Sequence, residues 1–248
     1  MAAEKAARSV LALDATGDAC SVAVLTASGS LVLRREEMRR GHAERLFPLI
    51  EEALDQSSMP LSAVDMIAAV RGPGSFTGVR VGVAAARGLA AATGAKAVGV
   101  DGFSAIAAAA HASGLSADRA AVLFGRPPRL LARIFRFDDS GYSPLDPPFE
   151  LDLGGDLSEL VGSARLLGAS LLGPGAEATA PLLTAAGWRG EVVSGSSAID
   201  VAFAARLAAA SEPSVDGPVG APSPFYLRPP DAEPGREPRP RRLGARLA

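Results

Sequence analysis

The alternation of apolar and polar residues in the first half of the chain predicts an α/β domain. Three apolar runs, separated by turns that contain glycine, are typical of strands, and longer runs with helical spacing follow them. The expected strands are 9–14, 21–26, 31–36, 66–70 and 97–100, and the expected helices are 43–56, 79–92 and 103–112. In chain order this is βββαβαβα, which indicates a mixed sheet covered by helices.

The pattern becomes weaker after about residue 121. Strands are expected at 121–124, 130–137 and 166–172, and helices at 176–186 and 198–210. Residues 211–248 hold nine of the chain's 19 prolines and end in several arginines, so a solvated tail is favoured over one that contacts RNA or an acidic neighbour. We therefore expect a first lobe at 1–115 that carries partner-binding helices, a smaller lobe at 116–210, and the tail at 211–248.

Both early helices are more apolar than a helix that covers one side of a sheet needs to be. In helix 43–56 we expect Ala43, Phe47, Ile50 and Leu54 to face the core. The surplus apolar surface indicates contact with a partner, although the two helices could instead pack only on each other. The expected partner-binding residues are Leu46, Leu49, Ala53, Val79, Val83, Ala86 and Ala90.

A glycine-rich run, Gly72 to Gly82, joins the strand at 66–70 to the helix at 79–92. Its spacing is Gly-x-Gly-x-x-x-Gly and it has no lysine, so it matches neither a Walker loop nor a dinucleotide-binding turn. We interpret it as a tight turn in which glycine permits close packing, with a ligand site as the alternative.

Composition excludes several classes of function. The chain has 248 residues, 48% of them apolar, and a net charge of −2, which describes a globular protein and argues against a stand-alone nucleic-acid binder. With Cys20 as the single cysteine and only His42 and His111, neither a disulfide framework nor a Cys/His zinc cluster is expected. The first apolar run is too short for a signal peptide or membrane span, so we expect a cytoplasmic protein.

Several segments resemble the bacterial TsaB family, also called YeaZ. They are Leu11 to Thr16, Cys20 to Val24, Gly41 to Ile50, Gly72 to Gly82, and the segment Pro224-Phe225-Tyr226-Leu227-Arg228, which is similar to a C-terminal signature of that family. The resemblance implies the ASKHA fold of actin, the heat-shock chaperone ATPases and the sugar kinases, an α/β fold with two mixed-sheet lobes of βββαβαβα type, here with a reduced second lobe. It also implies a non-catalytic subunit of the complex that forms N6-threonylcarbamoyladenosine at position 37 of tRNAs reading ANN codons.

The resemblance further implies which partners the chain has and which chemistry it lacks. In TsaD, the catalytic relative, two histidines four residues apart bind a metal, and Gly102 and Ile106 stand at the matching positions. The chain is therefore expected to have no catalytic residues and no metal of its own. TsaD is expected to bind through the first two helices. A TsaE-type ATPase, indirect contact with tRNA in the complex and a homodimer in the free state are also implied, with no membrane contact.

Four residues form a candidate nucleotide site on the same resemblance. Asp14 and Thr16 occupy positions that hold metal and phosphate in the wider fold, and Gly173 and Gly175 resemble the nucleotide loop of the second domain. Ala15 stands where sugar kinases have glycine, and Asp14 and Thr16 could instead only fix the hairpin. No cofactor of the chain's own is expected, and a nucleotide at a partner interface is left open.

Two other functions of the same fold remain as alternatives. A glycoprotease-like hydrolase would use Ser75, His42 and Asp14, but Ser75 is not in a Gly-x-Ser-x-Gly elbow. An ATP-dependent small-molecule kinase would use Asp14. The segment 122–135 departs from the family, which has an acidic strand followed by a tyrosine where this chain has Phe124 to Leu131.

Overall fold

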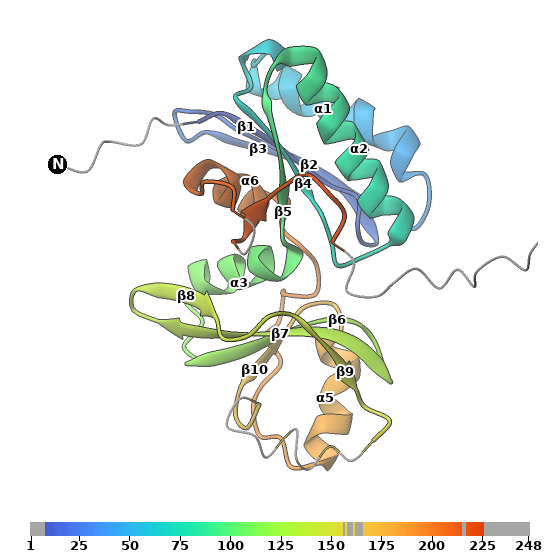
Figure 1. Cartoon of the computed structure of the whole chain (residues 1–248), viewed down its shortest axis with the longest axis vertical. Helices are drawn as coiled ribbons and strands as arrows, with labels where there is room; N and C mark the ends of the chain where they lie inside the picture. The colour runs from blue at the N-terminus through green and yellow to red at the C-terminus, as the bar shows by residue number, and fades with distance from the viewer. Residues whose placement is uncertain (1–7, 156, 158–160, 162–165, 215–216, 226–248) are drawn as a thin grey trace, which may run out of the picture.

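The chain folds into two lobes, each built on a mixed sheet. The computed structural model describes residues 8–155, 157, 161, 166–214 and 217–225 (Figure 1). The sheet of the first lobe has the order β11-β5-β4-β1-β2-β3, and that of the second has the order β10-β6-β7-β8, with β9 paired to β7. The predicted α/β class with a smaller second lobe is confirmed.

The first sheet contains strands from both ends of the described chain. They are β1 (Val10–Asp14), β2 (Ala19–Leu25), β3 (Leu31–Glu37), β4 (Met66–Val70), β5 (Lys96–Val100) and β11 (Val219–Gly220). β1, β4 and β5 are parallel neighbours, while β2, β3 and β11 run antiparallel to their partners. β1 and β4 lie in the middle and are buried on both faces, which explains their continuous apolar runs.

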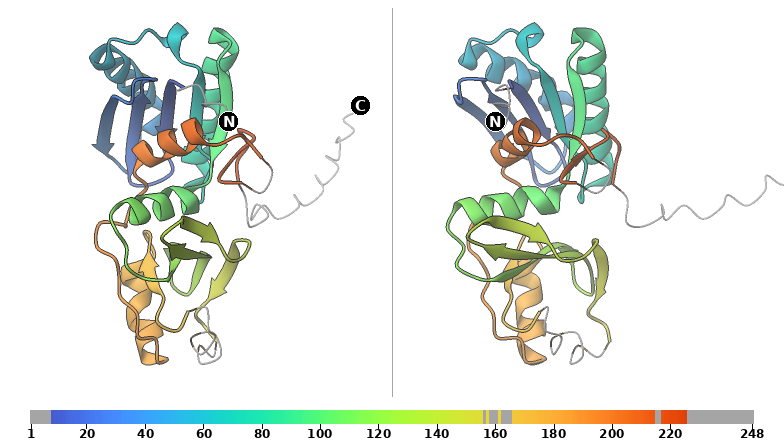
Figure 2. Two further views of the ribbon diagram at one scale, coloured as in Figure 1. Left: turned by 90° about the vertical axis from the view of Figure 1, so that its left-hand side faces the viewer. Right: turned by 60° about the vertical axis from the view of Figure 1, so that its left-hand side comes forward.

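The second sheet is formed by β6 (Arg119–Arg126), β7 (Arg129–Asp138), β8 (Gly141–Pro144), β9 (Phe149–Asp152) and β10 (Ser170–Leu172). The helices complete a layered arrangement (Figures 1 and 2). α1 (His42–Ser57) and α2 (Phe76–Thr93), joined through the short helix η1 (Leu61–Ala63) and β4, cover one face of the first sheet. α3 (Gly102–Ala112) and α6 (Val201–Ala210) lie between the two sheets, and α5 (Ala176–Ala185) covers the outer face of the second.

The position of α6 differs from the expected division at residue 210. We expected the helix at 198–210 in the smaller lobe, but α6 packs on β1, β2 and β4 of the first. Its apolar residues Val201, Ala204, Ala205 and Ala208 are buried in the same cluster as Val10 and Ala12. The chain therefore returns to the first lobe after α5, because the inner face of the first sheet needs a cover that α3 alone does not provide. Residues 226–248 of the expected tail lie outside the described residues.

The seven residues expected to bind a partner are buried inside the first lobe. Leu46, Leu49 and Ala53 of α1 are at most 2% exposed. The four expected residues of α2, which are Val79, Val83, Ala86 and Ala90, are at most 7% exposed. All seven pack with Leu11, Leu13, Val22 and Val24 of the sheet. Because a partner cannot reach these buried side chains, their assignment as partner-binding residues is wrong.

The physical reason is a rotation of α1 relative to the expected face. Residues 46, 49, 50, 53 and 54 recur at i, i+3, i+4, i+7 and i+8, which is the spacing of a core-facing stripe. Phe47, which we expected in the core, is 49% exposed. The outer face of α1 thus carries one large apolar side chain.

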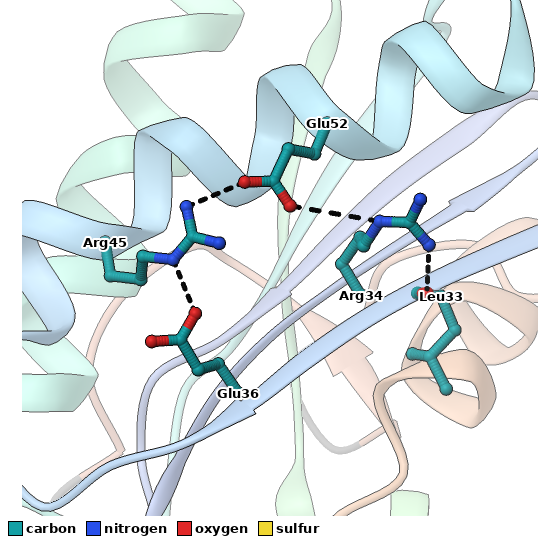
Figure 3. A network of polar contacts seen from close by, with 5 residues as sticks. All are labelled: Leu33, Arg34, Glu36, Arg45 and Glu52. Carbon is teal, nitrogen blue, oxygen red and sulfur yellow. Dashed lines mark hydrogen bonds and ion pairs between the residues drawn. The ribbon is translucent and has the colours of Figure 1, made fainter.

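A network of charged side chains joins α1 to the edge strand β3 (Figure 3). Arg45 contacts Glu36 at 2.6 Å and Glu52 at 2.8 Å, and Arg34 lies 3.9 Å from Glu52. These side chains are 30–47% exposed, so each pair contributes little stability by itself. Together they fix the start of α1 against the sheet.

Replacing Leu49 and Phe47 separately by alanine tests which face of α1 is internal. Leu49→Ala removes a buried side chain and is expected to lower the free energy of unfolding by about 2–5 kcal/mol. Phe47→Ala, two residues earlier on an exposed face, is expected to change it by less than about 1 kcal/mol. Urea unfolding followed by circular dichroism measures both, and equal losses would contradict the orientation of α1.

Candidate functional site

A cleft of about 1300 Å³ lies between the two lobes. From the first lobe it is lined by the β1–β2 hairpin, the C-terminal end of β3 and the start of α2. From the second it is lined by the β6–β7 turn and Pro174, and the segment 197–199 and Phe225 complete it. Its size exceeds that of a typical small-molecule pocket, about 300–1000 Å³. This cleft is the candidate functional site.

Asp14 and Thr16 line the cleft and are held by each other. Asp14, the last residue of β1, is 5% exposed, and its Oδ1 accepts hydrogen bonds from the amide of Thr16 at 2.9 Å and from its hydroxyl at 2.7 Å. Burial raises the pKa of Asp14 above its usual value, although Thr16, and to a lesser degree Arg35 and His42, act in the opposite direction. The pair fixes the hairpin, as one interpretation predicted, and also presents Asp14 to the cleft.

The glycine-rich run packs directly against this hairpin. A Cβ atom on Gly74 would lie 2.5 Å from the carbonyl oxygen of Thr16, and one on Gly78 would overlap the carbonyl oxygen of Ala15. The amide of Ser75 donates to the carbonyl of Thr16 at 2.7 Å. The prediction of a tight turn with close packing is therefore confirmed, since the glycines allow α2 to begin in contact with the β1–β2 backbone.

Gly173 and Gly175 have a structural explanation on the second lobe. Gly173 has a φ of +91°, and a Cβ atom there would lie 2.5 Å from the carbonyl oxygen of Leu123. Gly175 would meet the Leu130 side chain at 2.6 Å, and its amide donates to Leu123 at 2.9 Å. Both glycines pack on β6 and β7, and Pro174 between them is the residue that lines the cleft. The structure thus brings Asp14, Thr16 and Pro174 together at one site.

Ser75 and His42, which the hydrolase alternative would use, form hydrogen bonds with the backbone and not with each other. The hydroxyl oxygen of Ser75 accepts a hydrogen bond from the Gly78 amide at 3.3 Å and caps α2. The Nε2 atom of His42 lies 3.0 Å from the carbonyl oxygen of Gly17. No hydrogen bond joins Ser75 to His42 among the described residues, so a nucleophile with its base is not assembled.

A buried ion pair connects the two lobes, and no local sequence pattern predicts it. Arg133 of β7 contacts Asp101 at 2.7 Å, with the two side chains 11% and 4% exposed. Asp101 also caps α3 by accepting from the Phe103 amide at 3.1 Å and from the Ser104 hydroxyl at 2.8 Å. An aspartate just before an apolar helix is a recognisable capping signal, but Arg133 is distant in sequence and carried no such signal.

Phe225 attaches the end of the described chain to the same region. Its amide donates to the carbonyl of Arg71 at 2.8 Å, and the Arg71 guanidinium lies 5.5 Å from the centre of its ring. Burial lowers the pKa of Arg71, and its Nε atom has no hydrogen-bond partner in the part of the chain that is described. Of the signature segment 224–228, only Pro224 and Phe225 lie within the described residues.

Two general features of the described residues bear on function. No group of three or more histidine, cysteine, aspartate or glutamate side chains within them is placed to hold a metal ion. None of their helices combines the length and the apolar character needed to cross a membrane.

The two mixed sheets and the cleft between them, with Asp14 in its lining, define a two-lobed α/β protein. Residues 35–125 match the family model described as TsaD, tRNA N6-adenosine threonylcarbamoyltransferase. Over 81 residues the chain is 49% identical to the tRNA threonylcarbamoyladenosine biosynthesis protein TsaB of Haemophilus influenzae and 41% identical to that of Escherichia coli. These matches cover 33% of this chain and 34–35% of those proteins.

The chain thus spans about a third of the length of the curated relatives it matches. A solved structure, YeaZ from Pseudomonas aeruginosa, extends the similarity, with a TM-score of 0.70 and 26% identity over 89% of this chain and 100% of that one. In these parts of its sequence and in its fold, the chain is similar to TsaB and YeaZ proteins.

Substitution of two glycines in α2 separates close packing from helix propensity. Gly78→Ala places a methyl group on the Ala15 carbonyl and is expected to destabilise the protein by at least 1–3 kcal/mol, roughly the cost of overpacking. Gly88→Ala is the matched control, because nothing lies within 4 Å of its Cβ position, and it is expected to stabilise the helix by about 0.5–1 kcal/mol. Thermal unfolding of both variants checks the contrast, which would fail if Gly78→Ala were neutral.

The raised pKa of Asp14 predicts how stability depends on its charge. Because the folded protein holds this proton more tightly than the unfolded chain, ionisation of Asp14 opposes folding at pH values above its folded pKa. This penalty disappears as the pH falls below 3.8, where Asp14 is protonated in both states. Asp14→Asn keeps an oxygen acceptor for Thr16 and is expected to raise the unfolding temperature at about pH 7, with the gain fading at acid pH. A loss of stability at neutral pH would contradict the assignment.

Proposed function

We propose that this chain is the non-catalytic subunit of the complex that forms N6-threonylcarbamoyladenosine at position 37 of tRNA, where it binds and organises a TsaD-type catalytic subunit. The observation that carries the proposal is its similarity to TsaB and YeaZ proteins in both sequence and structure. The complex would act in the cytoplasm, with a TsaE-type ATPase as a further partner and tRNA contacted indirectly.

The surroundings of Gly102 and Ile106 support a role without chemistry of the chain's own. These residues stand at the positions that the resemblance matches to the metal-binding histidines of TsaD. Gly102 packs against the carbonyl of Gly72 and the side chain of Ile199, and its amide donates to that carbonyl at 2.9 Å. Ile106 is 2% exposed in the core between the lobes. Neither position offers a ligand or space for an ion.

The outer faces of α1 and α2 are the surface we propose for the catalytic subunit. The two helices lie side by side on the first sheet (Figure 1), and their inner faces are fully used by the core. The outer face of α1 presents Phe47, which is 49% exposed. On α2 the exposed residues Ala84, Gly88 and Ala91 follow at i, i+4 and i+7 and so share one face. Small residues there allow another helix to approach closely, and Phe47 supplies an apolar anchor.

The same surface is self-complementary enough to serve a homodimer when the catalytic subunit is absent, because two copies can pack their small-residue faces together. We further propose that a nucleotide, if one is held at the partner interface, contacts Asp14 and Thr16. Gly173 and Gly175 have no direct part in that contact, since both are packed on β6 and β7.

Variants of the outer helical face test the partner surface. Phe47→Asp and Ala84→Arg are expected to reduce co-elution with the TsaD-type subunit of the same genome, and tRNA modification by the reconstituted complex, by about tenfold or more each. The physical reason is that a desolvated charge or a long side chain is placed in an interface of small and apolar residues. Size-exclusion chromatography and mass spectrometry of the modified nucleoside provide the two measurements.

Leu33→Asp is the matched control for these variants. Leu33 is also exposed, at 42%, but it lies on the edge strand and alternates with Arg34, which faces α1. This variant should bind and support modification as the wild type does. The proposed function fails if the chain alone modifies tRNA, or if the catalytic subunit neither binds it nor depends on it.

A further inference from the structure

The tip of the β6–β7 hairpin holds two arginines that face each other. Arg126 and Arg129 are directly opposite in the antiparallel register and close a turn made of Pro127 and Pro128. Both arginines are exposed and both line the interlobe cleft. Residues directly opposite on neighbouring strands share a face of the sheet. The two arginines therefore lie on the same face of the hairpin, in the lining of the cleft.

Two like charges in this position destabilise a hairpin unless a counter-charge joins them. Neither guanidinium forms a hydrogen bond or ion pair with another described residue. Asp152 of β9 is opposite Arg129 in register, but its Oδ1 accepts from the Gly154 amide at 2.9 Å and no ion pair links it to Arg129 within the described ranges. Among the described residues, no acidic side chain therefore pairs with either arginine at the cleft.

The opposite end of the same two strands provides an internal comparison. Arg119 and Arg136 are also directly opposite in register. There, Asp118 lies 3.5 Å from Arg119 and supplies a negative charge. That end of the hairpin does not line the interlobe cleft. Within the described ranges, the two arginine pairs of this hairpin thus differ, because only the pair at the cleft end has no acidic partner.

The turn also orients the pair. Each proline has a fixed φ angle, so the four-residue turn Arg126-Pro127-Pro128-Arg129 has fewer accessible conformations than an ordinary turn. Two positions inward, and so on the same face of the hairpin, Phe124 and Leu131 are opposite each other and line the same wall of the cleft. The arginines therefore lie at the polar end of an otherwise apolar wall, which is the arrangement that small-molecule sites use to place one charged group.

The acidic side chains on the first-lobe side of the cleft do not balance the positive charge of its arginines. Asp14, Asp18 and Glu37 line the first-lobe side together with Arg35 and Arg80. Glu37 is bonded to Arg35 at 2.7 Å, and Arg80 lies over the Phe76 ring at 3.6 Å. Among the described residues that line the cleft, the arginines outnumber the acidic side chains, which favours an anion between the lobes.

We propose that Arg126 and Arg129 form a phosphate-binding site for a free phosphorylated small molecule held in the interlobe cleft. Paired guanidinium forks match phosphate oxygens in geometry and charge. Phosphate groups of RNA share this chemistry, but the concave cleft of about 1300 Å³ suits a small molecule. The chain's net charge of −2 also gives little support for binding RNA by itself. The inference does not rest on the proposed function.

Titration calorimetry of the full chain with sodium pyrophosphate and with ADP tests the site. The wild type should bind at least one of these probes. The double variant Arg126→Gln, Arg129→Gln should weaken binding by about 100-fold, because two charge-assisted contacts are lost. The double variant with lysine at both positions keeps the charge but not the fork, and should weaken it by about tenfold.

The double variant Arg119→Gln, Arg136→Gln is the matched control, with the same change of net charge in the same sheet. It should bind as the wild type does, and circular dichroism verifies that every variant is folded. The proposal is overturned if the wild type binds neither probe or if the control loses as much affinity as the cleft variant. It is also overturned if only a tRNA transcript binds in a manner that depends on Arg126 and Arg129.

Discussion

The buried contact between Asp101 and Arg133 determines how the two lobes face each other. It joins the first turn of α3 to the middle of β7, and it is surrounded by an apolar cluster in which Phe103, Phe124 and Phe135 from both lobes are packed. Removing one partner of such a pair leaves a charge in an apolar setting, which costs far more than a surface pair. The cleft, its lining from both lobes and the approach of Arg126 and Arg129 toward Asp14 all depend on this junction.

The first lobe separates its inner and outer helical surfaces sharply. Leu46, Leu49 and Ala53 complete the core, while Phe47 and the small residues of α2 remain outside. The two helices therefore combine a buried apolar face that completes the core with an outer face that still carries apolar and small side chains, which explains why they are apolar nearly all round.

The sequence predicted the order of the elements because each depends on local periodicity, and even β1 and β4 were recognisable as buried strands. The prediction of which face of α1 is buried was wrong because it gave weight to Phe47, which is large and apolar. The helical spacing of residues 46, 49, 50, 53 and 54 indicates the face that is buried. The return of α6, the Asp101–Arg133 pair and the opposition of Arg126 to Arg129 depend on contacts between distant segments or on strand register. No local pattern contains that information.

The pairing of β11 with β5 and the return of α6 make the first lobe a product of both ends of the chain. During synthesis, the early strands and α1 to α3 leave the ribosome long before residues 201–220 that cover them. The inner face of this sheet and the edge of β5 are then open to chaperones or to other nascent chains. A ribosome that stalls within the second lobe would therefore leave the inner face of the first sheet without α6 and β5 without its partner strand.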